Sequence, residues 1–227
     1  MGGAVDPNNP MAAEVKKIGG KIAGTDTARR GPWQYDYHLL GDRRTVNAFA
    51  LPGGQIFITV ALLGKLQDES QLAGVLGHET GHVIERHSAQ QMAQQNRNQM
   101  LVLATGVGAS DDQSNRGQMA AAAAAMAAQM SQLKYSRGDE IEADTWGVKL
   151  MVEAGYDPRG MIGVMTVLED ATKGGGHQPE MLLTHPYPEH RKQLLQAALQ
   201  KEFPQGIPTA LTKGAAFDWR NRLADQN

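Results

Sequence analysis

The sequence predicts an α+β fold that is mainly helical, with a small antiparallel sheet near the N-terminus. Three short segments rich in strand-forming residues come first, at residues 33–40, 44–50 and 55–60, and turn residues separate them. Most of the remaining chain shows helical patterning, and one Ala/Met-rich run is a strong helix former. Because the three strands follow one another directly, we expect them to pair as an antiparallel meander.

The helical segments are expected to begin and end at polar, Gly or Pro positions. Asp68 or Ser70 is a suitable cap for the helix that begins near residue 69, and Pro188 suits the first turn of the last helix. A polar stretch at residues 106–117 precedes the Ala/Met-rich helix, whose methionines fall near one face. We favour an adaptable packing face there over a mobile cover for a site. The expected helices span residues 11–30, 69–95, 118–133, 138–154, 158–172 and 188–202.

Composition indicates a soluble globular protein and excludes several kinds of site. The chain has 227 residues, 41% of them hydrophobic and 20% charged, and we expect one domain over residues 1–227 with residues 203–227 as a C-terminal extension. The net charge of −2, without a basic stripe, disfavours nucleic-acid binding. Because the chain has no cysteine, a metal site would have to use His together with Asp or Glu.

No targeting or membrane-spanning segment is expected. Residues 1–10 have neither a basic start nor an apolar stretch, which argues against a signal peptide. The longest apolar run, residues 119–128, has about half of the ~20 residues that cross a bilayer.

The sequence His-Glu-Thr-Gly-His at residues 78–82 carries the clearest chemical signal. On a helix, His78 and His82 lie one turn apart on the same side, so their imidazoles can bind one ion. Glu79 points about 100° away from His78 and falls on the apolar side of the helix with Val75. An ionised carboxylate there needs a partner, and a metal-bound water is such a partner, which Glu79 would deprotonate as general base.

The alternative to a metal site is a helix that carries this pattern by accident. Such an accident is expected about once in a hundred chains of this composition. Gly77 and Gly81 would each weaken the helix by roughly 1 kcal/mol relative to Ala, and close backbone packing or a bulky neighbour could explain them. The metal site is favoured because a second, acidic helix can supply the missing ligand.

Hydrolytic zinc sites usually have three protein ligands, and residues 138–144 are the expected source of the third. On a helical wheel, Glu142 lies on the solvent face with Lys149, whereas Glu140 and Asp144 lie on the opposite, apolar side. Glu140 as a zinc ligand and Asp144 as the acceptor for a ligand imidazole would satisfy both carboxylates. An acidic helix start favoured by the helix dipole would not explain Asp144, which lies beyond the first turn.

The other histidines are weaker candidates. His87 lies about half a turn around the helix from His78 and cannot easily bind the same ion. The following proline holds His185 in an extended conformation, and His185 could serve a site if the chain returns there. Packing, exposed or mobile positions are expected for His38, His177 and His190.

Between about residues 44 and 192 the chain contains four segments in a fixed order: VNAFALPGGQIFI, LAGVLGHETGHVIERHS, YSRGDEIEADTWG and THPYPEHR. Together they resemble peptidase family M48, which includes HtpX-type membrane proteases, CAAX prenyl proteases and soluble periplasmic BepA-type enzymes. The resemblance implies a gluzincin-like metallopeptidase fold with one zinc ion per chain. It implies that His78, His82 and Glu140 bind the zinc and that Glu79 is the base.

The later segments imply further roles. His185 resembles the family residue that approaches the metal or the transition-state oxyanion, and Arg191 resembles its companion, with a solvated helix position as the alternative for Arg191. An extended substrate would add as a strand along the segment of Asn47, Ala48, Phe49 and Ala50. A turn or edge role for Asn47 is an equal alternative.

These features together predict a zinc-dependent endopeptidase that hydrolyses extended or unfolded polypeptides. By resemblance, we expect it in the periplasm or cell envelope, in protein quality control, with outer-membrane or other envelope proteins as clients. From this sequence we expect neither the transmembrane helices nor the helical-repeat domain of some family members, and the sequence does not predict how substrates are recruited. The rivals are a zinc hydrolase for non-peptide bonds, which the strand edge disfavours, and a chaperone-like envelope factor with structural zinc.

Overall fold

The computed structural model describes residues 3–94, 134–173, 179–185 and 191–218, and it shows a mainly helical chain with one three-stranded sheet. This confirms the predicted fold class, apart from the direction of one strand. The named elements are α1 (Pro10–Ala23), α2 (Asp26–Arg29), β1 (Asp36–Leu40), β2 (Ala48–Ala50), β3 (Gln55–Thr59), α3 (Val60–Leu63), α4 (Glu69–Ile84), α7 (Arg137–Glu153), α8 (Arg159–Lys173), α9 (Glu180–Thr184) and α10 (Arg191–Glu202).

Several expectations fall on other parts of the chain. The polar break at residues 106–117, the Ala/Met-rich helix at residues 118–133, His177 and His190 lie outside the described residues. None of the helices in the described ranges combines the length and the hydropathy that a bilayer crossing requires.

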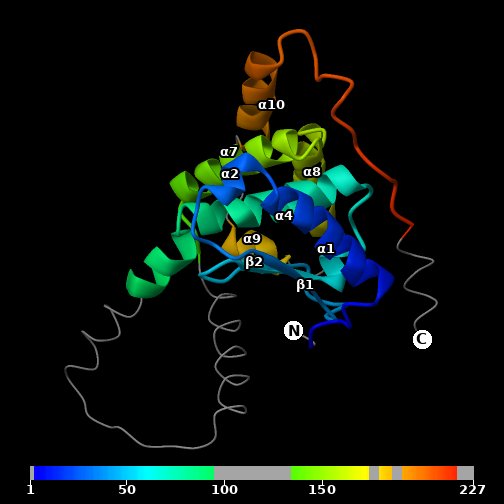
Figure 1. Ribbon diagram of the computed structural model, residues 1–227, viewed down its shortest axis with the longest axis vertical. Coiled ribbons are helices and arrows are strands. Elements are labelled where there is room, and N and C mark those ends of the chain that lie inside the picture. The colour runs from blue at the N-terminus through cyan, green and yellow to red at the C-terminus, as the bar shows by residue number, and fades with distance from the viewer. Residues whose placement is uncertain (1–2, 95–133, 174–178, 186–190, 219–227) are drawn as a thin grey trace, which may run out of the picture.

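Helix α4 lies in the middle of the molecule, with the sheet on one side and α7 on the other (Figure 1). It begins after Asp68, whose side chain accepts a hydrogen bond from the N–H of Gln71. Every residue from 69 to 83 is buried, because α1, α7, α8 and the sheet pack around the helix. The polar residues of α4 are therefore cut off from solvent and must find their partners inside the protein.

Helices α4 and α7 cross at close range because glycines lie between them. A Cβ atom on Gly77 would lie 3.1 Å from the carbonyl oxygen of Gly147, and one on Gly81 would lie 2.9 Å from that of Ala143. Close backbone packing is thus the observed reason for the two glycines beside the histidines. The crossing places Glu140, in the first turn of α7, next to the imidazoles of α4.

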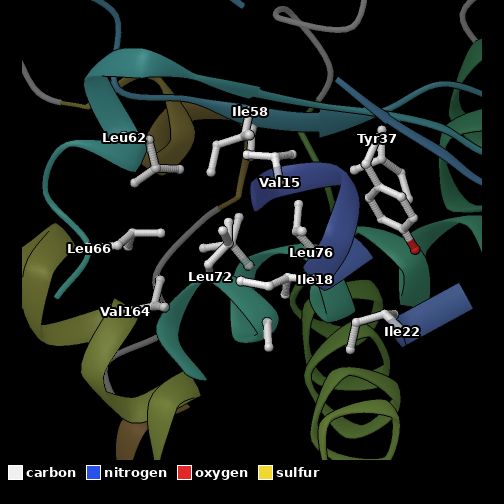
Figure 2. Packing of buried hydrophobic residues seen from close by; sticks show 14 of the residues in the cluster. Val15, Ile18, Ile22, Tyr37, Ile58, Leu62, Leu66, Leu72, Leu76 and Val164 are labelled. Atoms are coloured by element: carbon white, nitrogen blue, oxygen red, sulfur yellow. The ribbon is translucent and has the colours of Figure 1, made fainter. Parts of the chain in front are cut away.

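The main hydrophobic core lies between α1, the sheet and α4 (Figure 2). On α1, Val15, Ile18 and Ile22 are spaced so that they lie on one face, and all three are fully buried. They pack beside Leu72 and Leu76 of α4, which are also fully buried. Burial of side chains of this size contributes roughly 1.5–3 kcal/mol each, so this core holds α4 firmly in place.

The sheet is mixed, so the expected antiparallel meander is wrong. The strand order is β1-β3-β2, in which β2 pairs antiparallel with β3 but β1 pairs parallel with β3. Residues 41–47 do not form a hairpin: the Asp42 side chain accepts hydrogen bonds from the N–H groups of Arg44 and Thr45, and the chain continues to the far edge of β3. As a result β1 and β2 form the two edges of the sheet, and β2 packs against α4.

The expected helix over residues 69–95 is interrupted. Helix α4 ends at Ile84, Arg86 has a positive φ of 61°, and residues 87–94 form a separate helical segment. Neither Gly nor Pro marks this position, which is why the sequence did not predict the break. The expected helix over residues 11–30 is likewise split, into α1 and α2.

The described part of the C-terminal extension returns to the body of the protein. Thr212 pairs with Tyr156 and Ala216 pairs with Asp68 in isolated β-bridges. The N–H of Glu69 donates to the carbonyl of residue 215. A single domain over residues 1–227 remains a prediction.

Candidate metal centre

Four buried side chains from three parts of the chain meet beside α4. His78 and His82 come from α4, Glu140 comes from α7, and His185 directly follows α9. One possible ligand atom from each lies within 4.8 Å of the other three, and none of the four residues is more than 2% exposed. No other group of this kind occurs in the described residues.

The spacing of these atoms fits a metal ion. The Nε2 atoms of His78 and His82 are 3.1 Å apart, and they lie 3.6 Å and 3.4 Å from the carboxylate oxygens of Glu140. A tetrahedral ion with bonds of about 2.0–2.2 Å has ligand atoms roughly 3.3–3.6 Å apart. Nδ1 of His185 faces the same space, 3.4 Å from Nε2 of His78 and 3.0 Å from Glu140.

The imidazoles of His78 and His82 are both held by contacts to Nδ1, the nitrogen that does not face the cluster. Nδ1 of His78 donates to Asp144 at 2.9 Å, as the helical wheel of α7 suggests. Nδ1 of His82 lies 3.0 Å from Nδ1 of His87, and Nε2 of His87 lies 3.2 Å from Glu142. In both cases Nε2 is the nitrogen that faces the cluster. His87 is not among the clustered residues, yet it contacts one of them, which sequence reasoning missed.

Arg191, the first residue of α10, bridges the two inward carboxylates. Its guanidinium donates two hydrogen bonds to Asp144, one of them 2.6 Å long, and its Nη1 lies 2.6 Å from Oε2 of Glu140. The residue is 7% exposed, so the solvated alternative for Arg191 is wrong. The guanidinium compensates the charge of both carboxylates and fixes their orientation.

Glu79 is fully buried beside the cluster. Neither of its carboxylate oxygens has a hydrogen-bond partner among the described residues. Nε2 of His185, which also lacks a hydrogen bond there, is 3.6 Å from Oε1 of Glu79. A buried carboxylate without a partner costs free energy. Two imidazoles and a carboxylate with a second, bare carboxylate beside them therefore fit a metal ion that carries a water molecule.

The two glutamates of the site differ in their electrostatics. Burial raises the pKa of Glu79, and the neighbouring imidazoles offset only part of this effect. Burial also acts to raise the pKa of Glu140, but the charge of His185 and hydrogen bonds from His185 and His82 outweigh it and hold that pKa well below its usual range. Glu140 is thus the ionised carboxylate, and Glu79 is the one suited to accept a proton.

Strand β2 is connected to the cluster through two residues that the sequence did not single out. The ring of Tyr135 stacks on His82 with a centroid distance of 4.1 Å, and its hydroxyl lies 2.8 Å from that of Ser88. The Ser88 hydroxyl donates to the carbonyl oxygen of Ala50 at 3.0 Å. Both residues lie within the segments that carry the family resemblance, which is the signal that could have found them.

The expected substrate strand is buried along its whole length: Asn47, Ala48, Phe49 and Ala50. The N–H of Thr59 donates to the carbonyl of Asn47, which fixes the phase of the β2–β3 ladder. By alternation, the backbone N–H and C=O of Ala48 face away from β3, toward the outer edge. Oδ1 of Asn47 has no hydrogen-bond partner in the described part of the chain.

A small apolar cavity adjoins the cluster. Its volume is about 20 Å³, and it touches His78, His185 and Arg191. Three methionines contribute to its wall, and Met side chains adapt their shape readily. The apolar part of the wall, these methionines included, is formed by Val75, Met161, Val164, Met165, Leu168, Met181 and Leu182.

Comparison with known proteins decides the family. The model of peptidase family M48 matches residues 10–199, which include every residue of the cluster. This chain belongs to peptidase family M48. The family comprises metallopeptidases of the gluzincin type, which agrees with the mainly helical fold and with the His/Glu cluster.

Similar proteins match most of the chain. The beta-barrel assembly-enhancing protease of Yersinia pestis is 33% identical over 183 residues, covering 78% of this chain and 36% of that protein. The mitochondrial metalloendopeptidase OMA1 of Arabidopsis thaliana is 36% identical over 161 residues, covering 70% of this chain and 31% of that protein. The metalloprotease YcaL of Escherichia coli is 30% identical over 190 residues, covering 81% of this chain and 66% of that protein. The chain thus spans about a third of the length of the first two.

Proposed function

We propose that this chain is a zinc-dependent endopeptidase. The proposal rests on one observation: His78, His82 and Glu140 converge on one point, with the partnerless carboxylate of Glu79 beside it. Two imidazoles and one carboxylate form a ligand set typical of catalytic zinc, which leaves a position for water.

The side chains have distinct roles in peptide hydrolysis. Zinc supplies polarisation of the scissile carbonyl and a water of lowered pKa. Glu79 takes the proton from that water and passes it to the leaving amine, a task that its raised pKa suits. Burial lowers the pKa of His185, but the carboxylates of Glu140 and Glu79 outweigh this and raise it, so His185 can donate to the developing oxyanion.

An extended substrate pairs with the outer edge of β2. Asn47 and Ala48 are fully buried, so this edge must first be uncovered. Ala48 then presents an N–H and a C=O to a new strand, and Oδ1 of Asn47 is an acceptor for a substrate N–H. The Met-lined cavity, which touches His78 and His185, receives an apolar side chain next to the scissile bond when the methionines move aside. An extended peptide is a better match for this edge than a non-peptide ester or amide.

Unfolded envelope polypeptides are the proposed clients. The similarity to the beta-barrel assembly-enhancing proteases supports a role in the periplasm or cell envelope, in the quality control of outer-membrane proteins. The competing role is that of a chaperone-like envelope factor, in which zinc only stabilises the fold.

Two substitutions test the assignment. Glu79→Gln should keep one zinc per chain and lose proteolysis of unfolded casein, because the ligands remain while the base is removed. Glu140→Gln should lower zinc affinity by orders of magnitude. Glu142→Gln is the matched control: it lies on the same helix turn, its side chain is 61% exposed, and the Gln side-chain oxygen can still accept the hydrogen bond from His87, so zinc content should stay near that of the wild type.

The outcomes separate the proposal from its rivals. Casein cleavage by purified Glu79→Gln protein would refute the role of the base. Protection of unfolded casein from aggregation without cleavage, by the zinc-loaded wild type, would favour the chaperone. Cleavage of small esters but of no peptide would favour the non-peptide hydrolase.

A further inference from the structure

The turn that ends α4 is held in a strained conformation by residues from other elements. Arg86 has φ of 61°, which is uncommon for a residue with a side chain. Its guanidinium lies 5.1 Å from the ring centre of Trp33, and the neighbouring Glu85 accepts a hydrogen bond of 2.6 Å from Nε1 of Trp146. Strained backbone that its surroundings hold in place is often found at functional sites. The residues that this turn positions are therefore candidates for a function.

The turn brings His87 back against the metal centre. Had α4 continued, His87 would point away from His82; instead, the two ring centres are 5.1 Å apart. His87 is 3% exposed, and its two nitrogens face different partners: Nδ1 lies 3.0 Å from Nδ1 of His82, and Nε2 lies 3.2 Å from Glu142.

The chemistry of the partners fixes where the protons lie. An ionised carboxylate only accepts, so Nε2 of His87 carries the hydrogen and donates it to Glu142. Nδ1 of His87 is then the ring nitrogen that accepts, and Nδ1 of His82 is the donor between the two rings. The remaining nitrogen of His82, Nε2, is left bare and faces the cluster.

We propose that His87 is a positioning residue for the metal: it holds His82 in the tautomer and ring orientation that ligation requires, with Glu142 as its anchor. The inference deepens the proposed function and rests on it. His78 is oriented by a carboxylate, Asp144, whereas His82 is oriented by an imidazole that is itself oriented by a carboxylate. The exposed Glu142, which does not belong to the ligand set, thereby acquires an indirect role.

The test compares two substitutions of equal shape. His87→Leu removes the acceptor, and His87→Asn retains one, Oδ1, at the position of Nδ1. We expect the zinc dissociation constant, measured by competition with a chelator, to rise roughly 10–100-fold in His87→Leu and by less than about threefold in His87→Asn. Histidine side-chain ¹H–¹⁵N spectra of the metal-free full chain should show the His82 proton on Nδ1 in the wild type and a mixture of tautomers in His87→Leu.

His38→Leu is the control, because His38 lies on β1, outside the cluster, and is hydrogen-bonded to Gln55 of β3, so its loss should leave zinc affinity unchanged. Equal zinc affinity in wild type and His87→Leu, or equal losses in the Leu and Asn variants, would overturn the role of His87 while the zinc site itself stands. A wild-type protein that binds no zinc would instead overturn the proposed function. Circular dichroism of each metal-free variant shows whether it is folded.

Discussion

The α4–α7 helix pair and the three-stranded sheet serve the same proposed site in different ways. The helix pair brings together His78, His82 and Glu140, and their positions follow from spacing along two helices that touch backbone to backbone at Gly81. The sheet supplies the proposed substrate edge, and its strand order depends on pairing between segments that no local pattern specifies.

The difference teaches which part of the function is robust. The proposed metal ligands sit on a buried crossing with little room to move, whereas β2 is a three-residue edge strand that pairs with a neighbour on one side only. We therefore expect damage to the crossing to affect stability and metal binding together, and damage to the edge to affect substrate use alone.

The largest effect is expected when the charges at the helix pair are left unpaired. Arg191→Met removes the guanidinium that bridges Glu140 and Asp144, and the free energy of unfolding of the metal-free protein should fall by roughly 3–5 kcal/mol. Urea denaturation measures it. Lys192→Met is the matched control: its partner Glu169 is partly exposed, so the loss should stay below about 1 kcal/mol. Equal losses of stability in the two variants would show that the buried Arg191 bridge contributes no more than an exposed ion pair.

An intermediate effect is expected from a methyl group placed in the crossing. Ala at either Gly81 or Gly20 improves helix propensity by up to ~1 kcal/mol. At Gly81 the new Cβ would meet Ala143 at 2.9 Å, and overpacking of this kind costs about 1–3 kcal/mol, whereas at Gly20 nothing lies within 4 Å. Gly81→Ala should therefore be less stable than the wild type and bind zinc more weakly, and Gly20→Ala should be more stable. Thermal unfolding with and without zinc measures whether stability falls in Gly81→Ala and rises in Gly20→Ala.

The smallest effect is expected at the sheet edge. Ala48→Pro removes an N–H that faces the outer edge and leaves the ladder bonds to β3 in place. The ring at this buried position lowers stability, but zinc content should persist while kcat/KM for a peptide falls about 2–10-fold, the equivalent of one hydrogen bond. Phe49→Pro is the contrast, because residue 49 points its N–H toward β3 and its loss should destabilise the sheet. Unchanged peptide hydrolysis in Ala48→Pro would argue against strand addition at β2.

The sequence predicted the helix pair well because helical spacing is local. The four-residue spacing of His78 and His82, and the helical wheel that turns Glu140 and Asp144 inward, can be read without knowledge of the rest of the chain. The orientation of β1 could not be predicted in this way, since both pairings satisfy the same strand pattern. The turn at Arg86 could not be predicted either. Arg86 contacts Trp33 and Glu85 contacts Trp146, both from distant segments, and these contacts outweigh the local preference for a continuous helix.

The central claim is most directly tested by crystals of the protein reconstituted with one equivalent of zinc, with data collected at the zinc absorption edge. A single anomalous peak bonded to Nε2 of His78, Nε2 of His82 and the carboxylate of Glu140 is the predicted result. A peak elsewhere, or a Glu140 carboxylate turned away from both imidazoles, would contradict it.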